Sequence, residues 1–160
     1  TQHKDSRQWR RGLYVHWQRL FLHTMMKAMD APTREECTAE RPRSNTPNAA
    51  LVLLNDPTFI EAARAFAARV LNESDDSFEE RLTHAYQLCL SRSPEEDEVQ
   101  LLRNLFTQTH AEYESNAVAA KELLSLGKSP PPEGVDPVNL ASWTAVTRAL
   151  LNLSETVTRN

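Results

Sequence analysis

The sequence predicts an all-α protein, an irregular bundle of about six helices within a single domain spanning residues 1–160. Only three of the 160 residues are glycine, too few for the tight turns that join the short strands of a sandwich or barrel. Apolar side chains recur at helical spacing after polar capping residues, several of which precede a proline. With 40% apolar and 25% charged residues, the chain has enough apolar surface for one core. No apolar run approaches the roughly 20 residues that cross a bilayer, so we expect no membrane insertion.

The first predicted helix covers residues 6–22 and leads into an aperiodic segment. One face of this helix is apolar and consists of Trp9, Leu13, Trp17, Leu20 and Phe21. The methionines at positions 25, 26 and 29 are expected to fill the space where the chain leaves the helix. Residues 30–46 are polar, contain two prolines and lack periodicity, which predicts a long loop.

Each of the next four helices begins at a recognisable cap. Thr46-Pro47 opens a short apolar helix through residue 54, and Asp56-Pro57 opens a longer one. Ser77 with Glu80, and Ser93-Pro94 with Glu96, each predict a capping box. The apolar faces expected on the last three are Phe59, Ala62, Ala63, Phe66, Ala67, Val70 and Leu71, then Leu82, Ala85, Tyr86 and Cys89, then Val99, Leu102, Leu105, Phe106 and Tyr113.

A weaker helix and a final helix complete the predicted bundle. Residues 117–126 form the weaker helix, which Gly127 can end. Three consecutive prolines within residues 129–134 predict a stiff surface loop, read as a spacer in preference to a ligand for a proline-binding partner. Asp136-Pro137 begins the final helix, with the apolar face Leu140, Trp143, Val146, Leu150 and Leu153.

Charge is distributed unevenly along the chain. Residues 1–43 contain nine basic and five acidic side chains, whereas residues 44–160 contain nine and seventeen, for a net charge of −4. A basic, aromatic first helix is compatible with nucleic-acid binding, but dedicated nucleic-acid binders usually carry a strongly basic domain. Nucleic acid is therefore not the expected partner.

The 30–46 segment holds the candidate binding residues. Carboxylate, guanidinium, thiol, amide and hydroxyl groups gather there, in Asp30, Arg34, Cys37, Arg41, Arg43, Asn45 and Thr46. The preferred interpretation is a network that holds the loop closed by pairing its own polar groups. The alternative is a site in which the arginines bind an anionic or carbohydrate ligand.

No catalytic or metal-binding residue is assigned, and whether the chain is an enzyme stays open. Cys37 has no histidine nearer in sequence than His23 to activate it as a nucleophile. The five histidines lack the His-Glu-x-x-His spacing, and the two cysteines are too few for a zinc site. Cys37 and Cys89 could form one disulfide or none.

Several runs of residues carry a resemblance to a known family. The most specific are Arg41-Pro-Arg-Ser-Asn-Thr-Pro47 and Leu54-Asn-Asp-Pro57, supported by Arg10–Trp17, Asp30-Ala-Pro32, Cys37-Thr38, Leu90-Ser-Arg-Ser-Pro94 and Trp143–Asn152. On these runs the chain resembles the carboxy-terminal part of a planctomycete-specific domain of unknown function. Members of that family are large exported proteins with a second domain of unknown function and often a cytochrome-c-like domain.

The resemblance implies a setting but no reaction. It implies that the chain is a C-terminal fragment of a larger protein and is extracytoplasmic, either periplasmic or on the cell surface. It also implies that any haem sits on a missing neighbouring domain, so this fragment is expected to hold no cofactor. The expected partners are the other domains of the same parent chain.

Three functional hypotheses follow from these observations. The leading one is a non-catalytic helical interaction or scaffold module of a larger exported multidomain protein, which a cytochrome-c-like neighbour would link to redox chemistry. The alternative is part of an extracytoplasmic enzyme, hydrolase-like and directed at carbohydrate, with the 30–46 loop lining the site. The second alternative is nucleic-acid binding through the basic first helix.

Overall fold

The computed structural model describes Tyr14, Glu35 and residues 22–32, 37–40, 46–74 and 77–157. This part of the chain contains eight helices and no strand, which confirms the all-α prediction; six of these helices match predicted ones, and two short helices were not predicted. The internal contacts divide the chain into two compact units, Thr1–Asn55 and Asp56–Asn160. The expectation of a single domain stays a prediction. Among the described helices, none has both the length and the apolar character needed to cross a bilayer.

The first unit contains two helices that pack against each other, α1 (Thr24–Ala28) and α2 (Pro47–Asn55). The sequence did not predict α1, because five residues are too few to show a helical period. The predicted helix over residues 6–22 lies outside the described residues, apart from Tyr14 and Leu22. The described residues of the 30–46 segment form neither helix nor strand, which confirms the predicted loop over that part.

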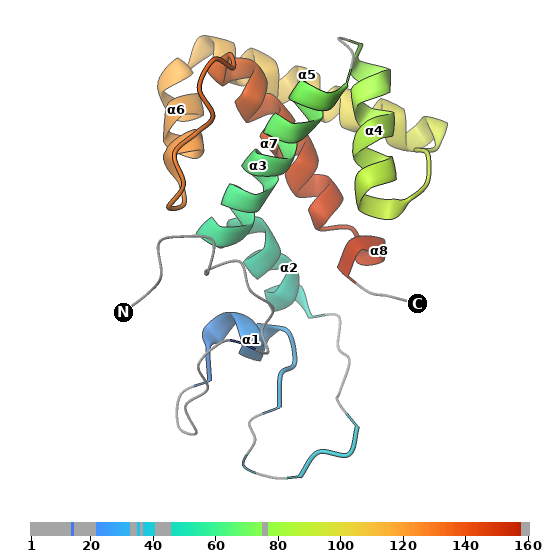
Figure 1. Ribbon diagram of the computed structural model, residues 1–160, viewed down its shortest axis with the longest axis vertical. Coiled ribbons are helices and arrows are strands. Elements are labelled where there is room, and N and C mark those ends of the chain that lie inside the picture. The colour runs from blue at the N-terminus through green and yellow to red at the C-terminus, as the bar shows by residue number, and fades with distance from the viewer. Residues whose placement is uncertain are drawn as a thin grey trace. The chain divides into compact units, whose positions relative to one another are not determined.

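The second unit is built around one central helix. Its elements are α3 (Pro57–Glu73), α4 (Phe78–Leu90), α5 (Glu96–Ser115), α6 (Ala117–Ser125), α7 (Pro137–Leu151) and α8 (Ser154–Val157). Figure 1 shows α7 running through the middle of this unit, where it packs against each of the other five helices. Because α7 is surrounded, its polar side chains at 142, 144 and 147 are buried along with its apolar face.

Three of the predicted caps are present in this unit. Asp56 accepts a hydrogen bond from the amide of Thr58 at 2.8 Å, and Asp136 accepts one from the amide of residue 139 at 2.8 Å. The hydroxyl of Ser77 accepts from the amide of Glu80 at 3.2 Å and donates to its carboxylate at 2.7 Å. Each cap satisfies main-chain N–H groups in the first turn of its own helix, which is why local sequence predicts it.

The predicted cap at Ser93 is wrong. Helix α5 begins at Glu96, with Glu95 as its N-cap residue, and the amide of Glu95 donates to the carboxylate of Glu98 at 2.8 Å. The carbonyl of Ser93 instead accepts a hydrogen bond from Arg92 at 3.2 Å. A contact with Arg92 therefore replaces the expected role in helix capping.

The core of the second unit lies where α3, α4, α5, α6 and α7 meet. Its largest fully buried side chains are Trp143, Tyr86, Leu82, Leu140, Leu150, Val70 and Val146. The ring of Trp143 lies 5.3 Å from that of Phe78 and 5.5 Å from that of Phe106, measured between centroids. These three rings join α4, α5 and α7 at distances that favour aromatic pairing.

The buried face of α3 is rotated from the predicted one. Ala63, Ala67 and Val70 are buried as expected, but Ala62 is exposed, and Glu61 and Arg64 are buried with 3% and 2% of their surface exposed. These two charged residues can be buried on α3 because both bind main-chain groups of the α6–α7 connection.

Candidate functional site

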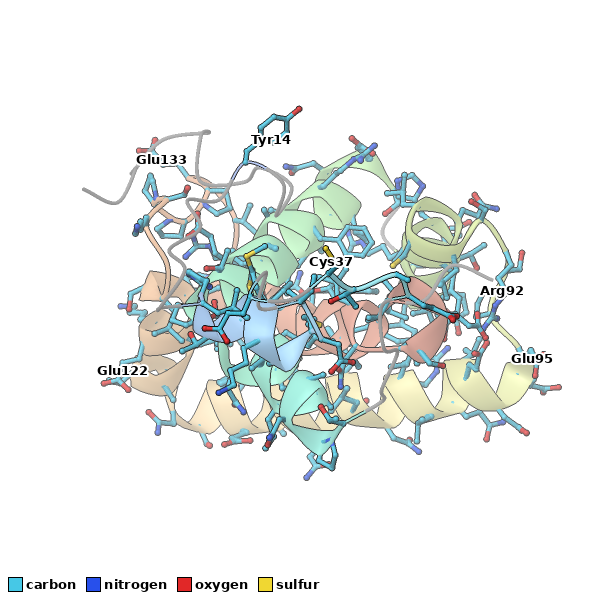
Figure 2. The ribbon with its side chains drawn as sticks, turned by 90° about the horizontal axis from the view of Figure 1, so that it is seen from below. Tyr14, Cys37, Arg92, Glu95, Glu122 and Glu133 are labelled. Atoms are coloured by element: carbon cyan, nitrogen blue, oxygen red, sulfur yellow. The ribbon has the colours of Figure 1, made fainter. Side chains whose placement is uncertain are left out.

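Three of the seven predicted binding residues fall among the described residues. Asp30 follows α1 with a φ of +55°, a left-handed conformation that aspartate tolerates better than most residues. The hydroxyl of Thr46 accepts a hydrogen bond from the amide of Ala49 at 3.2 Å, so its side chain caps α2. Cys37 is exposed (Figure 2). The other four, Arg34, Arg41, Arg43 and Asn45, lie outside the described residues.

The two cysteines are both free thiols, so no disulfide joins them. Cys89 is half-buried on α4, and its sulfur lies 3.5 Å from the hydroxyl oxygen of Thr156. The predicted place of Cys89 on the inner side of its helix is therefore only partly realised.

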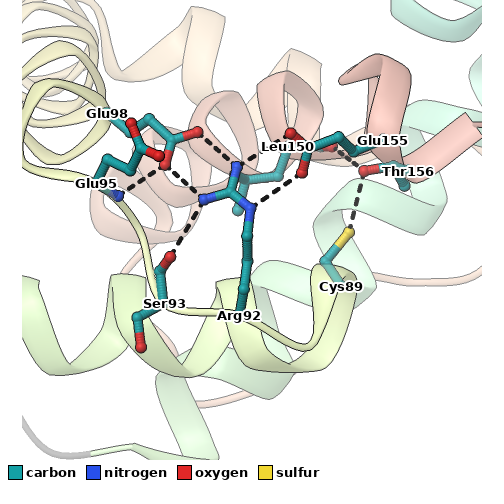
Figure 3. A network of polar contacts seen from close by, with 8 residues as sticks. All are labelled: Cys89, Arg92, Ser93, Glu95, Glu98, Leu150, Glu155 and Thr156. Atoms are coloured by element: carbon teal, nitrogen blue, oxygen red, sulfur yellow. Dashed lines mark hydrogen bonds and ion pairs between the residues drawn. The ribbon is translucent and has the colours of Figure 1, made fainter.

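A network around Arg92 joins the α4–α5 connection to α8 (Figure 3). Two guanidinium nitrogens of Arg92 donate to the two carboxylate oxygens of Glu98 at 2.7 and 2.8 Å, a bidentate arrangement. The Nε atom donates to Glu155 at 3.0 Å, and the guanidinium carbon lies 5.1 Å from the centre of the Tyr86 ring. Figure 2 shows Arg92 and Glu95 close together where α5 begins. Every guanidinium nitrogen of Arg92 thus has an acceptor inside the protein.

The electrostatics of this network favour permanent charges. The hydrogen bonds from Arg92 are the main cause that lowers the pKa of Glu98 to about 2. Glu98 and Glu155 raise the pKa of Arg92 above its already high ordinary value. Burial raises the pKa of Tyr86 to about 12, and the negative charge of Glu98 adds to this effect. General acid–base catalysis works best with a pKa near the working pH, so these groups are suited to holding helices together instead.

A second network holds the connection between α6 and α7 against α3. One terminal nitrogen of Arg64 donates to the main-chain carbonyls of Leu124 and Leu126, the latter at 3.1 Å, and the other donates to that of Ser129 at 2.6 Å. The last carbonyls of a helix have no partner within the helix, so the guanidinium supplies donors at the end of α6.

Glu61 completes this network from the preceding turn of α3. Its carboxylate accepts hydrogen bonds from the amides of Lys128 at 2.7 Å and Ser129 at 3.2 Å. Burial acts to raise the pKa of Glu61, but the hydrogen bonds from Ser129 and Lys128, with the charge of Arg64, bring it below its ordinary value. Burial also lowers the pKa of Arg64, which the charge of Glu61 opposes. This pair and residues 124–129 together form the Glu61–Arg64 clamp.

A third, exposed cluster joins the end of α3 to α4. The carboxylate of Glu73 accepts from Arg69 at 2.9 and 3.0 Å, and its Oε2 atom lies 3.3 Å from Nε2 of His84. The hydrogen bonds from Arg69 are the main cause that lowers the pKa of Glu73. The contact between Glu73 and His84 links α3 to α4.

Sequence reasoning missed the clamp and the Arg92 network for the same reason. Their partners lie 60 or more positions apart in several cases, so local patterns carry no signal for the pairing. One usable signal is the three-residue spacing of Glu61 and Arg64, which places both on one side of a helix. Another usable signal is Arg92 in the Leu90–Pro94 run, which lies between two predicted helices. Within the described residues, no group of three histidine, cysteine or acidic residues could hold a metal ion.

Comparison with known proteins identifies a family. The family described as PSD1, protein of unknown function (DUF1553), matches residues 1–106. This range includes most of the runs on which the sequence resemblance depends, whereas Trp143–Asn152 lies beyond it. Neither the curated proteins nor the solved structures show a significant match to the chain.

Proposed function

The chain belongs to the PSD1 family of proteins of unknown function (DUF1553), and from this premise we propose that it is a non-catalytic interaction or scaffold module. The proposed setting is a larger exported multidomain protein, linked to redox chemistry by a cytochrome-c-like domain elsewhere in the parent chain. The sequence resemblance supports that setting. Under this proposal any haem is held by the neighbouring domain.

The observation that carries the proposal is that the buried and half-buried charged side chains bind other groups of the protein. Arg64, Glu61, Arg92 and Glu98 are committed to main-chain groups and to one another at helix ends and connections. A site that acts on a ligand keeps some donors and acceptors available for it. The two networks instead join α3 to the α6–α7 connection and the α4–α5 connection to α8, as a rigid scaffold requires.

The partners we propose are other domains of the same parent chain. The described surface offers them isolated apolar side chains on two helices that pack together, Leu101 on α5 with 70% and Val118 on α6 with 66% of its surface exposed. Apolar side chains buried at an interface contribute to association in proportion to the area removed from water. Substitutions at these two positions therefore test whether the other domains bind to this surface.

Binding between separately expressed parts of the parent protein tests the proposal. The other domains of the parent chain would be titrated into it by isothermal calorimetry. We expect Leu101→Lys or Val118→Lys to weaken binding about tenfold if the position lies at the centre of the interface. Gln100→Lys is the matched control, because it places the same charge at an exposed position beside Leu101.

Two results would count against this function. One is the absence of any binding to the other domains of the parent chain. The other is turnover of a polysaccharide or ester that Cys37→Ala or Arg43→Ala abolishes while the circular dichroism spectrum stays unchanged, which would favour the carbohydrate-directed enzyme.

A further inference from the structure

We propose that α8 is a latch on α4, which opens while the corner between α4 and α5 stays closed, and that opening uncovers the thiol of Cys89. The latch is the Ser154–Val157 helix, and the corner comprises residues 91–98. The inference concerns a conformational device in the second unit and does not depend on the proposed function.

Arg92 serves two carboxylates that differ in exposure. Glu98 in the corner has 28% of its side-chain surface exposed, whereas Glu155 in the latch has 57% exposed. Glu98 receives two hydrogen bonds from Arg92 at 2.7 and 2.8 Å, while those to Glu155 are 3.0 and 3.4 Å long. Glu98 also accepts from the amide of Glu95 at 2.8 Å. The Arg92–Glu98 pair is therefore short and bidentate, and a main-chain amide also binds its carboxylate. The Arg92–Glu155 pair is longer and more exposed to solvent (Figure 3).

The first contact joins the latch to the corner, and a second contact, a weak hydrogen bond from a thiol, joins it to α4. The hydroxyl of Thr156 has a single proton, which it donates to the carbonyl of Leu150 at 2.7 Å. At the 3.5 Å contact with Cys89 it can then only accept, so the S–H group of Cys89 is the donor. A thiol is a weak donor, and this contact adds little to the attachment.

Packing adds few contacts that would hold the latch shut. No residue of α8 is buried, and Val157 is exposed. Helix α8 stays tethered to the end of α7 by the hydrogen bond from the Thr156 hydroxyl to the carbonyl of Leu150, so it can separate from α4 without leaving α7. Salt screens an exposed ion pair much more than a partly buried bidentate one, so salt should open the latch before the corner.

Labelling of the Cys89 thiol tests the proposal. Cys37→Ser first removes the exposed thiol, and N-ethylmaleimide then labels Cys89; this reagent is uncharged, so salt does not alter its own approach to the protein. We expect Glu155→Gln to raise the labelling rate about twofold to fivefold, the range that loss of an exposed ion pair allows. Added sodium chloride should raise the rate of the parent toward that of the variant and change the variant little.

Glu133→Gln is the matched control, with the same change of charge at an exposed residue that Figure 2 shows at the opposite end of the unit from Arg92. Amide hydrogen exchange supplies the second measurement. If amide exchange in Glu155→Gln is faster in residues 153–157 and unchanged in residues 91–98, the latch opens while the corner stays closed. An unchanged labelling rate in Glu155→Gln, a rise also in Glu133→Gln, or exchange that rises equally in the corner overturns the proposal.

Discussion

Gly127 is the position where one added carbon should cost this protein most, and Gly134 provides the comparison. Gly127 follows α6 with a φ of +99°, and Gly134 has a φ of +82°. A Cβ atom at Gly127 would lie 2.8 Å from Cβ and 2.9 Å from Cδ of Glu61, and closer still to its Oε2 atom. At Gly134 a Cβ would meet nothing within 4 Å. Both alanine variants share the backbone cost, and only Gly127→Ala disturbs the Glu61–Arg64 clamp.

The expected losses follow from these contacts. An alanine at positive φ costs about 1–2 kcal/mol at either position. Glu61 is 3% exposed and its carboxylate is held by two amides, so it cannot swing away without giving up hydrogen bonds to a charged group, at about 1.5–3 kcal/mol. We therefore expect Gly127→Ala to lower the free energy of unfolding by about 2.5–5 kcal/mol and Gly134→Ala by about 1–2 kcal/mol.

Urea denaturation followed by far-ultraviolet circular dichroism measures both losses. Amide hydrogen exchange at Lys128 and Ser129 reports on the clamp directly and should accelerate in Gly127→Ala alone. Equal losses in the two variants would show that Glu61 moves aside freely, and would refute the reasoning that the clamp is rigid.

Three further variants test the networks and the core. Glu98→Gln should lower the free energy of unfolding by about 1.5–3 kcal/mol at neutral pH. Because the pKa of Glu98 in the folded protein is about 2, below the ordinary 4.5, its contribution is complete above pH 4.5 and disappears as the pH falls through 2; urea titrations across this range should show the two proteins converging. Asp136→Ala removes a helix cap and should cost about 1 kcal/mol in the same assay, with Glu133→Gln nearby costing nothing measurable. Leu150→Ala opens a cavity in the core and should cost about 2–5 kcal/mol; a loss below 1 kcal/mol would contradict its placement there.

Much of the fold could be predicted because it depends on local interactions. The caps at Asp56, Ser77 and Asp136 bind main-chain amides two or three residues away, so the sequence around each one contains the whole interaction. The inner face of α7 could also be predicted, since Leu140 and Trp143 recur at helical spacing. Helices α1 and α8 are too short to show a period, and the sequence did not predict them.

The candidate site was predicted less well. The side chain of Thr46 belongs to a helix cap. Four of the other predicted binding residues lie outside the described residues, namely Arg34, Arg41, Arg43 and Asn45. The charged groups that the structure does bring together were not among the predicted ones, because their partners lie 60 or more positions away along the chain in several cases. Glu98, for example, stands in an acidic first turn that helix electrostatics alone would explain.

By itself, the sequence determined the helical class, most helix starts and which apolar stripes face inward. These properties depend on neighbours within one or two turns, where chain geometry fixes the distances. Only the tertiary structure decided that α3 turns Glu61 and Arg64 inward, and that Arg92 binds Glu155. Burying a charge is unfavourable until a partner from elsewhere in the chain arrives with its donors and acceptors in place. Such a partner is defined by how the helices pack, and no local pattern specifies it.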